Sequence, residues 1–179
     1  MKVLTFGEIM LRLKTPEYLR IVQADGFEAS YGGAESNVAV SLASFGDEAA
    51  FVTKLPENPV GEAALNELRR YGVDTSLVLK GGPRLGIYYF EKGTNIRPTN
   101  VVYDRAGSSI SVADSSEFDW EKLLSGIGIF YFSGVTPAIS DSIAKAVEEA
   151  LIYCHAHHIQ VVCDLNSVSY THLTLPTTP

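Results

Sequence analysis

Four short, almost continuous apolar runs, separated by stretches of helical periodicity, constrain the fold of this chain more than any other feature. They span residues 3–6, 49–52, 127–132 and 159–163, and none alternates strictly between apolar and polar positions. Such runs are typical of strands that are covered on both faces, as in a parallel sheet. The sequence therefore predicts a parallel sheet at the centre of the fold.

Helical patterns fill the intervals between these runs. Apolar side chains recur every three or four residues in three sets, which are Val38, Leu42 and Phe45; Leu65, Leu68 and Tyr71; and Ile143, Val147, Ala150, Leu151 and Cys154. Gly46 and Gly72 follow the first two sets, as glycine often does where a helix ends. We therefore expect an α/β fold, a doubly wound and mostly parallel sheet with ligands bound outside the carboxyl ends of its strands.

Two segments depart from this alternation. Residues 11–31 hold no helical pattern, and residues 84–105 contain two extended runs, at 87–91 and 101–105, joined by a polar turn. The second segment is typical of a β-hairpin. Because both leave from the side of the sheet where ligands bind, we expect a small β-sheet lid that excludes water during group transfer. Surface decoration is the alternative that the pattern leaves open.

Composition excludes several classes of function. The chain has 179 residues and is 46% hydrophobic, enough for one globular domain or most of one. A net charge of −7 argues against nucleic acid as a partner. No apolar window approaches the roughly 20 residues of a membrane helix, and the first residues lack the features of a signal peptide, so we expect a soluble cytoplasmic protein. Cys154 and Cys163 are expected to be buried free thiols.

The segment 167–179 differs from the rest, since it has no charged side chain and is rich in Thr and Pro. We expect it to be a non-native or disordered tail and exclude it from fold reasoning. Three histidines precede it, His155, His157 and His158, near the end of a predicted helix. There imidazole interacts favourably with the helix dipole, so we assign no metal site to them.

A glycine-opened junction at residues 32–37 offers the best indication of function. Gly32 and Gly33 follow an extended stretch and lead into a predicted helix. A ligand can approach bare glycine backbone closely, and the first amides of a helix have no internal partner, so anionic or hydroxyl-rich ligands suit this place. Asn37 can both donate to and accept from a hydroxyl, or it can cap the helix.

These motifs resemble the ribokinase-like (PfkB) carbohydrate kinases, and most closely the 2-keto-3-deoxygluconate kinases. The matching elements, in chain order, are FGEIML at 6–11, GGAESNVA at 32–39, Gly61, GIY at 86–88, YDR at 103–105, SGVTP at 133–137 and DLN at 164–166. The resemblance covers residues 1–166. It implies the N-terminal part of one kinase domain, with lid segments at about 11–31 and 84–105 and the C-terminal part of the fold missing.

The resemblance implies the site residues. It assigns the binding of sugar hydroxyls to Gly33, Ala34, Glu35, Ser36 and Asn37, and the grip on a carboxylate and ketone end to Tyr88, Tyr103 and Arg105. Guanidinium can hold a carboxylate through two charge-assisted hydrogen bonds, although these three side chains are also ordinary members of a hairpin. Asn166 is implied to lie beside the nucleotide phosphates. Arg12 stands where many neutral-sugar members carry an acid, which favours an anionic substrate unless Arg12 is simply solvent-exposed.

The implied activity is ATP-dependent phosphorylation of a 2-keto-3-deoxy sugar acid, 2-keto-3-deoxygluconate, with Mg²⁺. The family's base is an aspartate in a Gly-Ala-Gly-Asp segment that this sequence lacks, so no residue is assigned as catalytic and the 179-residue chain is expected to be inactive. The alternatives are a fructokinase or other neutral-sugar kinase, and a non-catalytic sugar-acid binding protein. Small-molecule sugar acid and ATP are the expected partners, and lid strands that pair between subunits would give a homo-oligomer.

Overall fold

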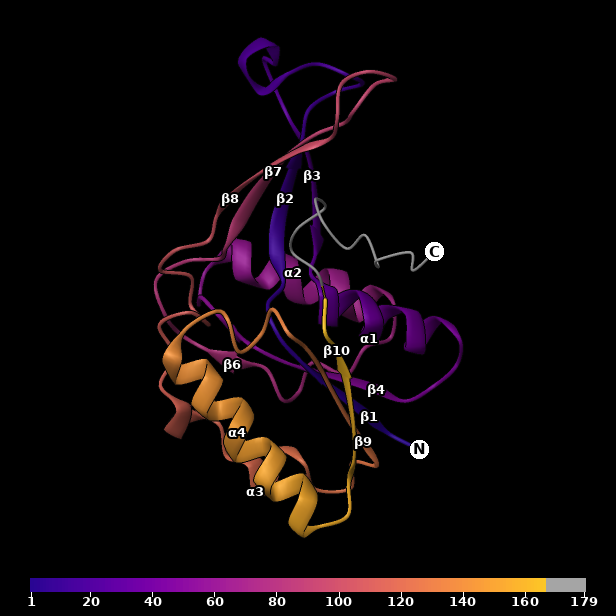
Figure 1. Ribbon diagram of the computed structural model, residues 1–179, viewed down its shortest axis with the longest axis vertical. Helices are drawn as coiled ribbons and strands as arrows, with labels where there is room; N and C mark the ends of the chain where they lie inside the picture. Colours follow the sequence, from indigo (N-terminus) through magenta and orange to yellow (C-terminus); the bar gives the residue numbers. More distant parts are fainter. Residues whose placement is uncertain (167–179) are drawn as a thin grey trace, which may run out of the picture.

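A computed structural model describes residues 1–166 as an α/β body with a smaller β-sheet standing on it (Figure 1). The body sheet has four parallel strands in the order β10-β9-β1-β4, namely β1 (Val3–Phe6), β4 (Ala49–Val52), β9 (Ile129–Ser133) and β10 (Gln160–Asp164). Two short parallel strands, β5 (Lys54–Leu55) and β6 (Leu79–Lys80), form a separate pair. The predicted parallel sheet is confirmed, and the expected tail at 167–179 lies outside the described residues.

Helices pack against both faces of this sheet. α1 (Ala34–Ser44) and α2 (Pro59–Arg70) cover one face, and α3 (Trp120–Leu123) and α4 (Asp141–Ala156) cover the other. Successive β4 residues enter different cores, since Phe51 packs with the α1 and α2 side chains and Val52 with those of α3 and α4. A strand buried from both sides needs apolar residues at every position, which explains the continuous runs.

The helical patterns predict α2 and α4 better than α1. In α4, the predicted positions Ile143, Val147, Ala150 and Cys154 are all buried. Phe45 and Tyr71, expected on the apolar faces of α1 and α2, are instead 84% and 45% exposed, and each lies one residue beyond the end of its helix. The side chains that α1 buries are those of Glu35, Ser36 and Ala39.

The edge strand β10 contradicts one expectation. Its apolar run predicts burial on both faces, yet all five residues are exposed. Cys163 is therefore an exposed thiol, whereas Cys154 is buried as predicted. Within residues 1–166, β10 pairs with β9 alone, so its outer edge carries unpaired backbone groups.

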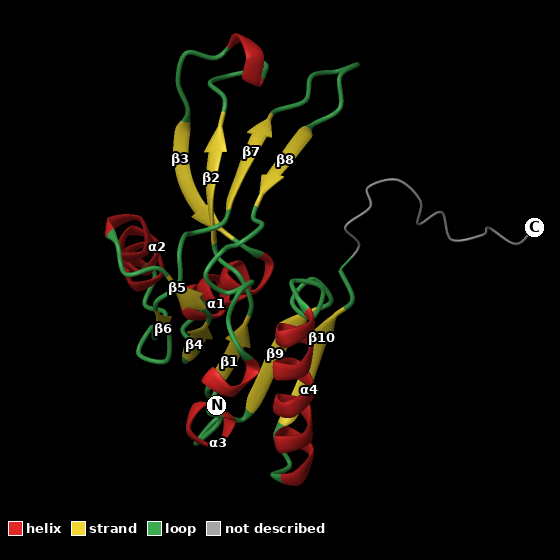
Figure 2. Ribbon diagram, turned by 90° about the vertical axis from the view of Figure 1, so that its left-hand side faces the viewer, coloured by secondary structure: helices red, strands yellow, loops and turns green. Residues whose placement is uncertain are grey.

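The second sheet has the order β3-β2-β7-β8 and rises beyond the ends of the body strands (Figure 2). Its strands are β2 (Met10–Lys14), β3 (Glu28–Gly32), β7 (Ile87–Glu91) and β8 (Asn100–Asp104). β7 and β8 form the predicted antiparallel hairpin, while β2 and β7 run parallel. Two 3₁₀ turns, η1 (Ile21–Gln23) and η2 (Ser115–Glu117), complete the elements. None of the helices in residues 1–166 is long and apolar enough to cross a membrane.

Candidate functional site

A cavity of about 490 Å³ lies between the lid and the start of α1. Side chains and backbone from both sheets line it, namely Met10, Arg12, Gly33, Ala34, Asn37, Tyr88, Phe90, Val101, Tyr103, Arg105, Val135 and Asn166. Val135 and Asn166 follow the body strands β9 and β10, so the cavity sits outside the carboxyl ends of the sheet, where the fold class predicts ligand binding. Two of the lining residues are arginines and none is acidic.

The lid presents one face to this cavity. Side chains of a strand alternate between faces, and the lining residues of β2, β7 and β8 stand two positions apart on each strand. Arg12, Tyr88 and Tyr103 occupy one row, since Arg12 is paired with Tyr88 and Tyr88 with Tyr103 across neighbouring strands. The two tyrosine rings lie 5.9 Å apart between centroids. Burial raises the pKa of Tyr88, and its hydroxyl therefore remains a hydrogen-bond donor at neutral pH.

The floor of the cavity is the glycine-opened junction. Gly33 precedes α1 as its N-cap residue in an extended conformation. A Cβ atom on Gly33 would lie 1.9 Å from the carbonyl oxygen of Glu8, so only glycine fits there. Ala34 and Asn37 follow on the cavity side. Because Gly33 is the N-cap residue, the alternative in which Asn37 caps the helix is wrong.

Glu35 and Ser36 lie beneath this floor rather than in the cavity. Glu35 is buried, and its carboxylate accepts hydrogen bonds from the Ser133 backbone N–H at 3.1 Å and from the hydroxyls of Ser133 and Thr136. The Ser36 hydroxyl donates to the carbonyl of Gly33 at 3.1 Å. These contacts tie the first turn of α1 to the end of β9 and fix the position of the floor.

Arg105 follows β8 and forms an ion pair with Glu8, a residue to which the sequence motifs assign no role. The Arg105 Nη2 lies 2.5 Å from the Glu8 Oε2, and the Ser108 hydroxyl donates to the Glu8 Oε1 at 2.6 Å. Glu8 is 4% exposed, and this burial raises the pKa of its carboxyl despite the opposing effects of Arg105 and Ser108. An acid two residues after a buried strand, with apolar residues following it, is the signal that could have identified it.

A second anchor holds the base of the hairpin. The guanidinium of Arg84 contacts both carboxylate oxygens of Asp104 at 2.9 Å and also donates to the Asp104 carbonyl at 3.0 Å. Asp104 is the residue that joins the lid strand β8 to Arg105. The bidentate pair therefore limits the freedom of the segment that carries Arg105.

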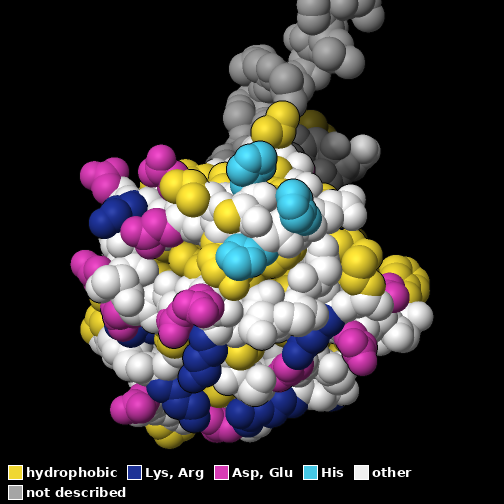
Figure 3. All heavy atoms as spheres, turned by 90° about the horizontal axis from the view of Figure 1, so that it is seen from below, with side chains coloured by type: hydrophobic (Ala, Val, Ile, Leu, Met, Phe, Trp, Pro, Cys, Tyr) yellow, Lys and Arg dark blue, Asp and Glu magenta, His cyan; other side chains and the backbone are white. Residues whose placement is uncertain are grey.

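Asn166 lines the same cavity, and its backbone N–H donates to the Asp164 carboxylate at 3.0 Å. Within residues 1–166, no group of three or more His, Cys, Asp or Glu side chains could hold a metal ion. His155 lies in the last turn of α4, and His157 and His158 follow the helix. These three histidines gather on the face seen from below (Figure 3), away from the lid. The described residues alone therefore supply no three-ligand cluster for Mg²⁺.

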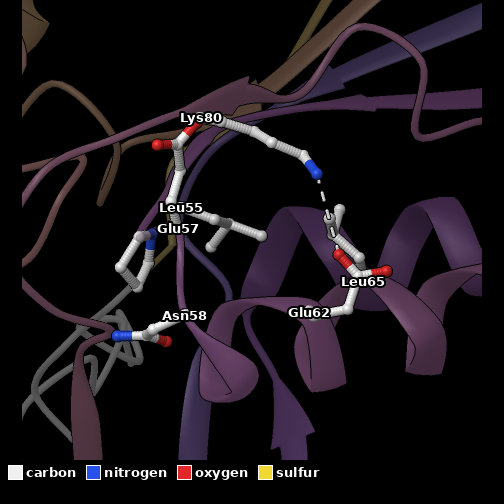
Figure 4. A pocket seen from close by; sticks show the side chains of 7 residues that line it. Leu55, Glu57, Asn58, Glu62, Leu65 and Lys80 are labelled. Carbon is white, nitrogen blue, oxygen red and sulfur yellow. Dashed lines mark ion pairs between the residues drawn. The ribbon is translucent and has the colours of Figure 1, made fainter.

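A smaller hollow of about 290 Å³ lies at the start of α2 (Figure 4). The Asn58 side chain there accepts from the backbone N–H groups of Val60 and Gly61, and Lys80 faces Glu62 at 3.7 Å. The side chains of Asn58, Glu62 and Lys80 are thus partnered within the chain. The cavity under the lid is the better candidate for a ligand site.

A two-sided α/β body, a four-stranded lid and a cavity floored by glycine match the ribokinase-like fold. The chain belongs to the pfkB family of carbohydrate kinases, whose family model matches residues 1–175. This finding confirms the resemblance inferred from the motifs.

Two similar proteins carry more specific names. The chain is 41% identical over 150 residues to a 2-dehydro-3-deoxygalactonokinase of Haloferax volcanii, covering 84% of this chain and 47% of the relative. The crystal structure of a 2-dehydro-3-deoxygluconokinase from Thermotoga maritima is similar with a TM-score of 0.91 and 52% identity, over 93% of this chain and 51% of that one. The chain therefore spans about half the length of the relatives it matches.

A sugar kinase of Pyrococcus horikoshii, whose structure was solved in complex with ATP, has a TM-score of 0.81 at 22% identity. This likeness covers 92% of the present chain and 53% of that one. At this identity the similarity concerns the fold alone.

Proposed function

We propose that the protein containing this sequence is an ATP-dependent kinase that phosphorylates a 2-keto-3-deoxy sugar acid such as 2-keto-3-deoxygluconate. The observation that carries the proposal is the charge of the cavity. In a chain with a net charge of −7, the lining contains two arginines and no acidic side chain. A cavity of this kind favours an anionic ligand over a neutral sugar.

The cavity also supplies hydrogen-bonding groups for the rest of such a ligand. The hydroxyls of Tyr88 and Tyr103 and the amide of Asn37 can each donate and accept, as a sugar hydroxyl does. In this proposal Gly33, Ala34 and Asn37 contact the ligand. Glu35 and Ser36 support the floor from below, and Asn166 lies toward the phosphate donor.

ATP supplies the transferred phosphoryl group, and phosphoryl transfer also needs a base for the attacking hydroxyl. The family resemblance assigns that base to a Gly-Ala-Gly-Asp segment, which this sequence does not contain. The role of the described residues is therefore to bind and orient the sugar acid and, through the lid, to shield it from water.

Isothermal titration of the 179-residue chain tests the substrate class. We expect 2-keto-3-deoxygluconate to bind at least tenfold more tightly than fructose, with its galactonate epimer as a third ligand because relatives with both names exist. Equal or tighter binding of fructose would favour a neutral-sugar kinase instead. In the full-length protein, a coupled assay for ADP separates a kinase from a non-catalytic sugar-acid binding protein.

A further inference from the structure

The carboxylate of Glu8 lies at the base of the lid, and both of its oxygens contact the segment that follows β8. Its Oε1 accepts a hydrogen bond from the Ser108 hydroxyl at 2.6 Å, and its Oε2 lies 2.5 Å from the Arg105 Nη2. Glu8 and Ser108 are both buried. Because Glu8 belongs to the segment between β1 and β2, these contacts join the end of a body strand to the end of a lid strand.

The backbone around this carboxylate leaves room for it. A Cβ atom on Gly86, which precedes β7, would lie 2.6 Å from the Glu8 Oε1 and 3.1 Å from the Cγ of Met10. Any side chain at position 86 would therefore displace the carboxylate. The Gly86 carbonyl accepts from the Leu11 backbone N–H at 2.9 Å, which fixes the glycine against β2. The base of the lid, and not Arg105 alone, thus determines where the carboxylate lies.

Stability alone does not explain this arrangement. The cost of removing two charges from water offsets most of the attraction within a buried ion pair. For Glu8 this cost is visible in the pKa of its carboxyl, which burial raises. Arg105, by contrast, has a side chain that is 27% exposed and lines the cavity. The pair is better explained by its effect on Arg105 at the ligand site.

A fixed carboxylate limits the orientations that the Arg105 guanidinium can adopt. A free arginine side chain samples many rotamers, and ordering it when a ligand binds costs entropy. Contact with Glu8 orders the side chain before the ligand arrives. A guanidinium carries five N–H donors in one plane, so a contact through Nη2 leaves donors for a second carboxylate. Glu8 and a ligand can therefore hold the same guanidinium at the same time.

We propose that Glu8 is a positioning residue, which orients the guanidinium of Arg105 toward the carboxylate of the sugar acid. The inference rests on the proposed function, because it concerns the same site, and it adds Glu8 to the residues that the family resemblance implies. The negative charge of Glu8 by itself repels an anionic ligand. The gain from orientation must exceed this repulsion, and the two effects have opposite signs in a binding experiment.

The test measures binding of 2-keto-3-deoxygluconate and of its methyl ester, which lacks the charge, to the 179-residue chain by isothermal titration. Circular dichroism compares the fold of each variant. We expect Glu8→Gln to weaken binding of the acid about tenfold, the lower end of the range for one charge-assisted contact because the guanidinium itself remains, and binding of the ester less than about threefold. Equal or tighter binding of the acid by Glu8→Gln would show that repulsion dominates and would overturn the proposal.

Glu8→Asp separates position from charge. The aspartate carboxylate keeps the charge, but it is one methylene shorter and cannot reach both Arg105 and Ser108 as Glu8 does. We therefore expect Glu8→Asp to weaken binding of the acid as Glu8→Gln does. If Glu8→Asp binds the acid as tightly as the original chain, the position of the carboxylate is unimportant and the proposal is wrong.

A double variant determines whether Glu8 acts through Arg105. Because Arg105→Gln removes the guanidinium, adding Glu8→Gln to it should weaken binding of the acid by less than about a further twofold. A purely structural role of Glu8 would instead give losses that multiply. Multiplied losses would show that Glu8 acts independently of Arg105.

Asp74→Asn is the matched control, because Asp74 forms an ion pair of 2.7 Å with Lys2, which precedes β1 at the end of that strand away from Glu8. We expect this variant to bind the acid within about twofold of the original chain. A loss as large as that in Glu8→Gln would mean that any broken ion pair has this effect, against the proposal. If the original chain shows no preference for the acid over the ester, the proposed function fails; if it shows the preference and Glu8→Gln keeps the full affinity, only the role of Glu8 is refuted.

Discussion

Replacement of Gly33 by alanine tests the reasoning about the cavity floor most directly. The added Cβ would lie 1.9 Å from the carbonyl oxygen of Glu8, more than 1 Å short of the 3.0 Å that real Cβ contacts keep. The neighbour is backbone and cannot rotate away, so either the start of α1 or the segment at Glu8 must move. We expect an overpacking cost of about 3 kcal/mol, at the upper end of the usual range.

Two further terms set the net effect of Gly33→Ala. The φ of Gly33 is −173°, an extended conformation that alanine also adopts, so no backbone strain is added. Alanine lowers the conformational entropy of the unfolded chain, which returns about 0.7 kcal/mol. The free energy of unfolding should therefore fall by about 2 kcal/mol, and Tm by roughly 4–8 °C for a domain of this size.

The adjacent Gly32→Ala is the matched control. Its Cβ would lie 3.3 Å from the Asn37 side chain, which can shift, and 3.9 Å from the Tyr88 hydroxyl, an ordinary van der Waals contact. We expect its stability to stay within about 0.5 kcal/mol of the unaltered chain. Urea unfolding and thermal unfolding of both variants give the comparison. A Gly33→Ala chain as stable as the original, or a Gly32→Ala chain equally damaged, would refute the assignment of Gly33 to a close backbone approach.

Three other predictions concern the buried acids Glu35 and Glu8 and the Gly-Ala-Gly-Asp segment that this sequence does not contain. Glu35→Ala should lower the free energy of unfolding by about 3 kcal/mol, because it leaves the buried hydroxyl and backbone N–H of Ser133 without their acceptor and leaves the Thr136 hydroxyl with the Phe6 carbonyl alone; a loss below about 1 kcal/mol in urea unfolding would contradict this bracing role. Glu8 has a pKa raised by burial, so the folded state holds its proton to higher pH than the unfolded state, and the stability of the original chain relative to Glu8→Gln should decrease as pH rises from the ordinary value of 4.5 through the raised pKa. Unfolding at a series of pH values measures this, and a relative stability that increases with pH would show the sign to be wrong. The 179-residue chain should bind the sugar acid but produce no ADP from ATP, since it lacks the Gly-Ala-Gly-Asp segment; sustained turnover would disprove this.

Local pattern predicts much of the fold. The bounds of β1 and β4 agree residue for residue with the apolar runs, because both strands are buried on both faces. The same pattern fails for β10, whose residues are exposed. A run of apolar residues indicates that a strand can be buried on both faces. It does not show whether other elements cover those faces in the described part of the chain.

The sequence motifs predict only part of the candidate site, because they record neighbours along the chain and not packing in space. The motifs identify the floor residues Gly33 and Asn37 and the tyrosines of the lid row, which share the cavity. They do not distinguish Asn37, which lines the cavity, from its neighbour Glu35, whose carboxylate turns toward the end of β9. Helix residues two positions apart point in directions about 200° apart, and only the packing of α1 on the sheet decides which of them meets the ligand.

The sequence by itself determined the alternation of strands and helices, the glycines of the junction and the kinship with carbohydrate kinases, because each is written in residues close together along the chain. The tertiary structure alone decided how the charges are paired. Glu8 lies two residues after β1 and Arg105 directly after β8, and the fold brings their side chains to 2.5 Å while it places Arg12 over the ring of Phe90. Electrostatic interactions depend on distance in space, so the pairing of Arg105 with Glu8 is a property of the folded chain.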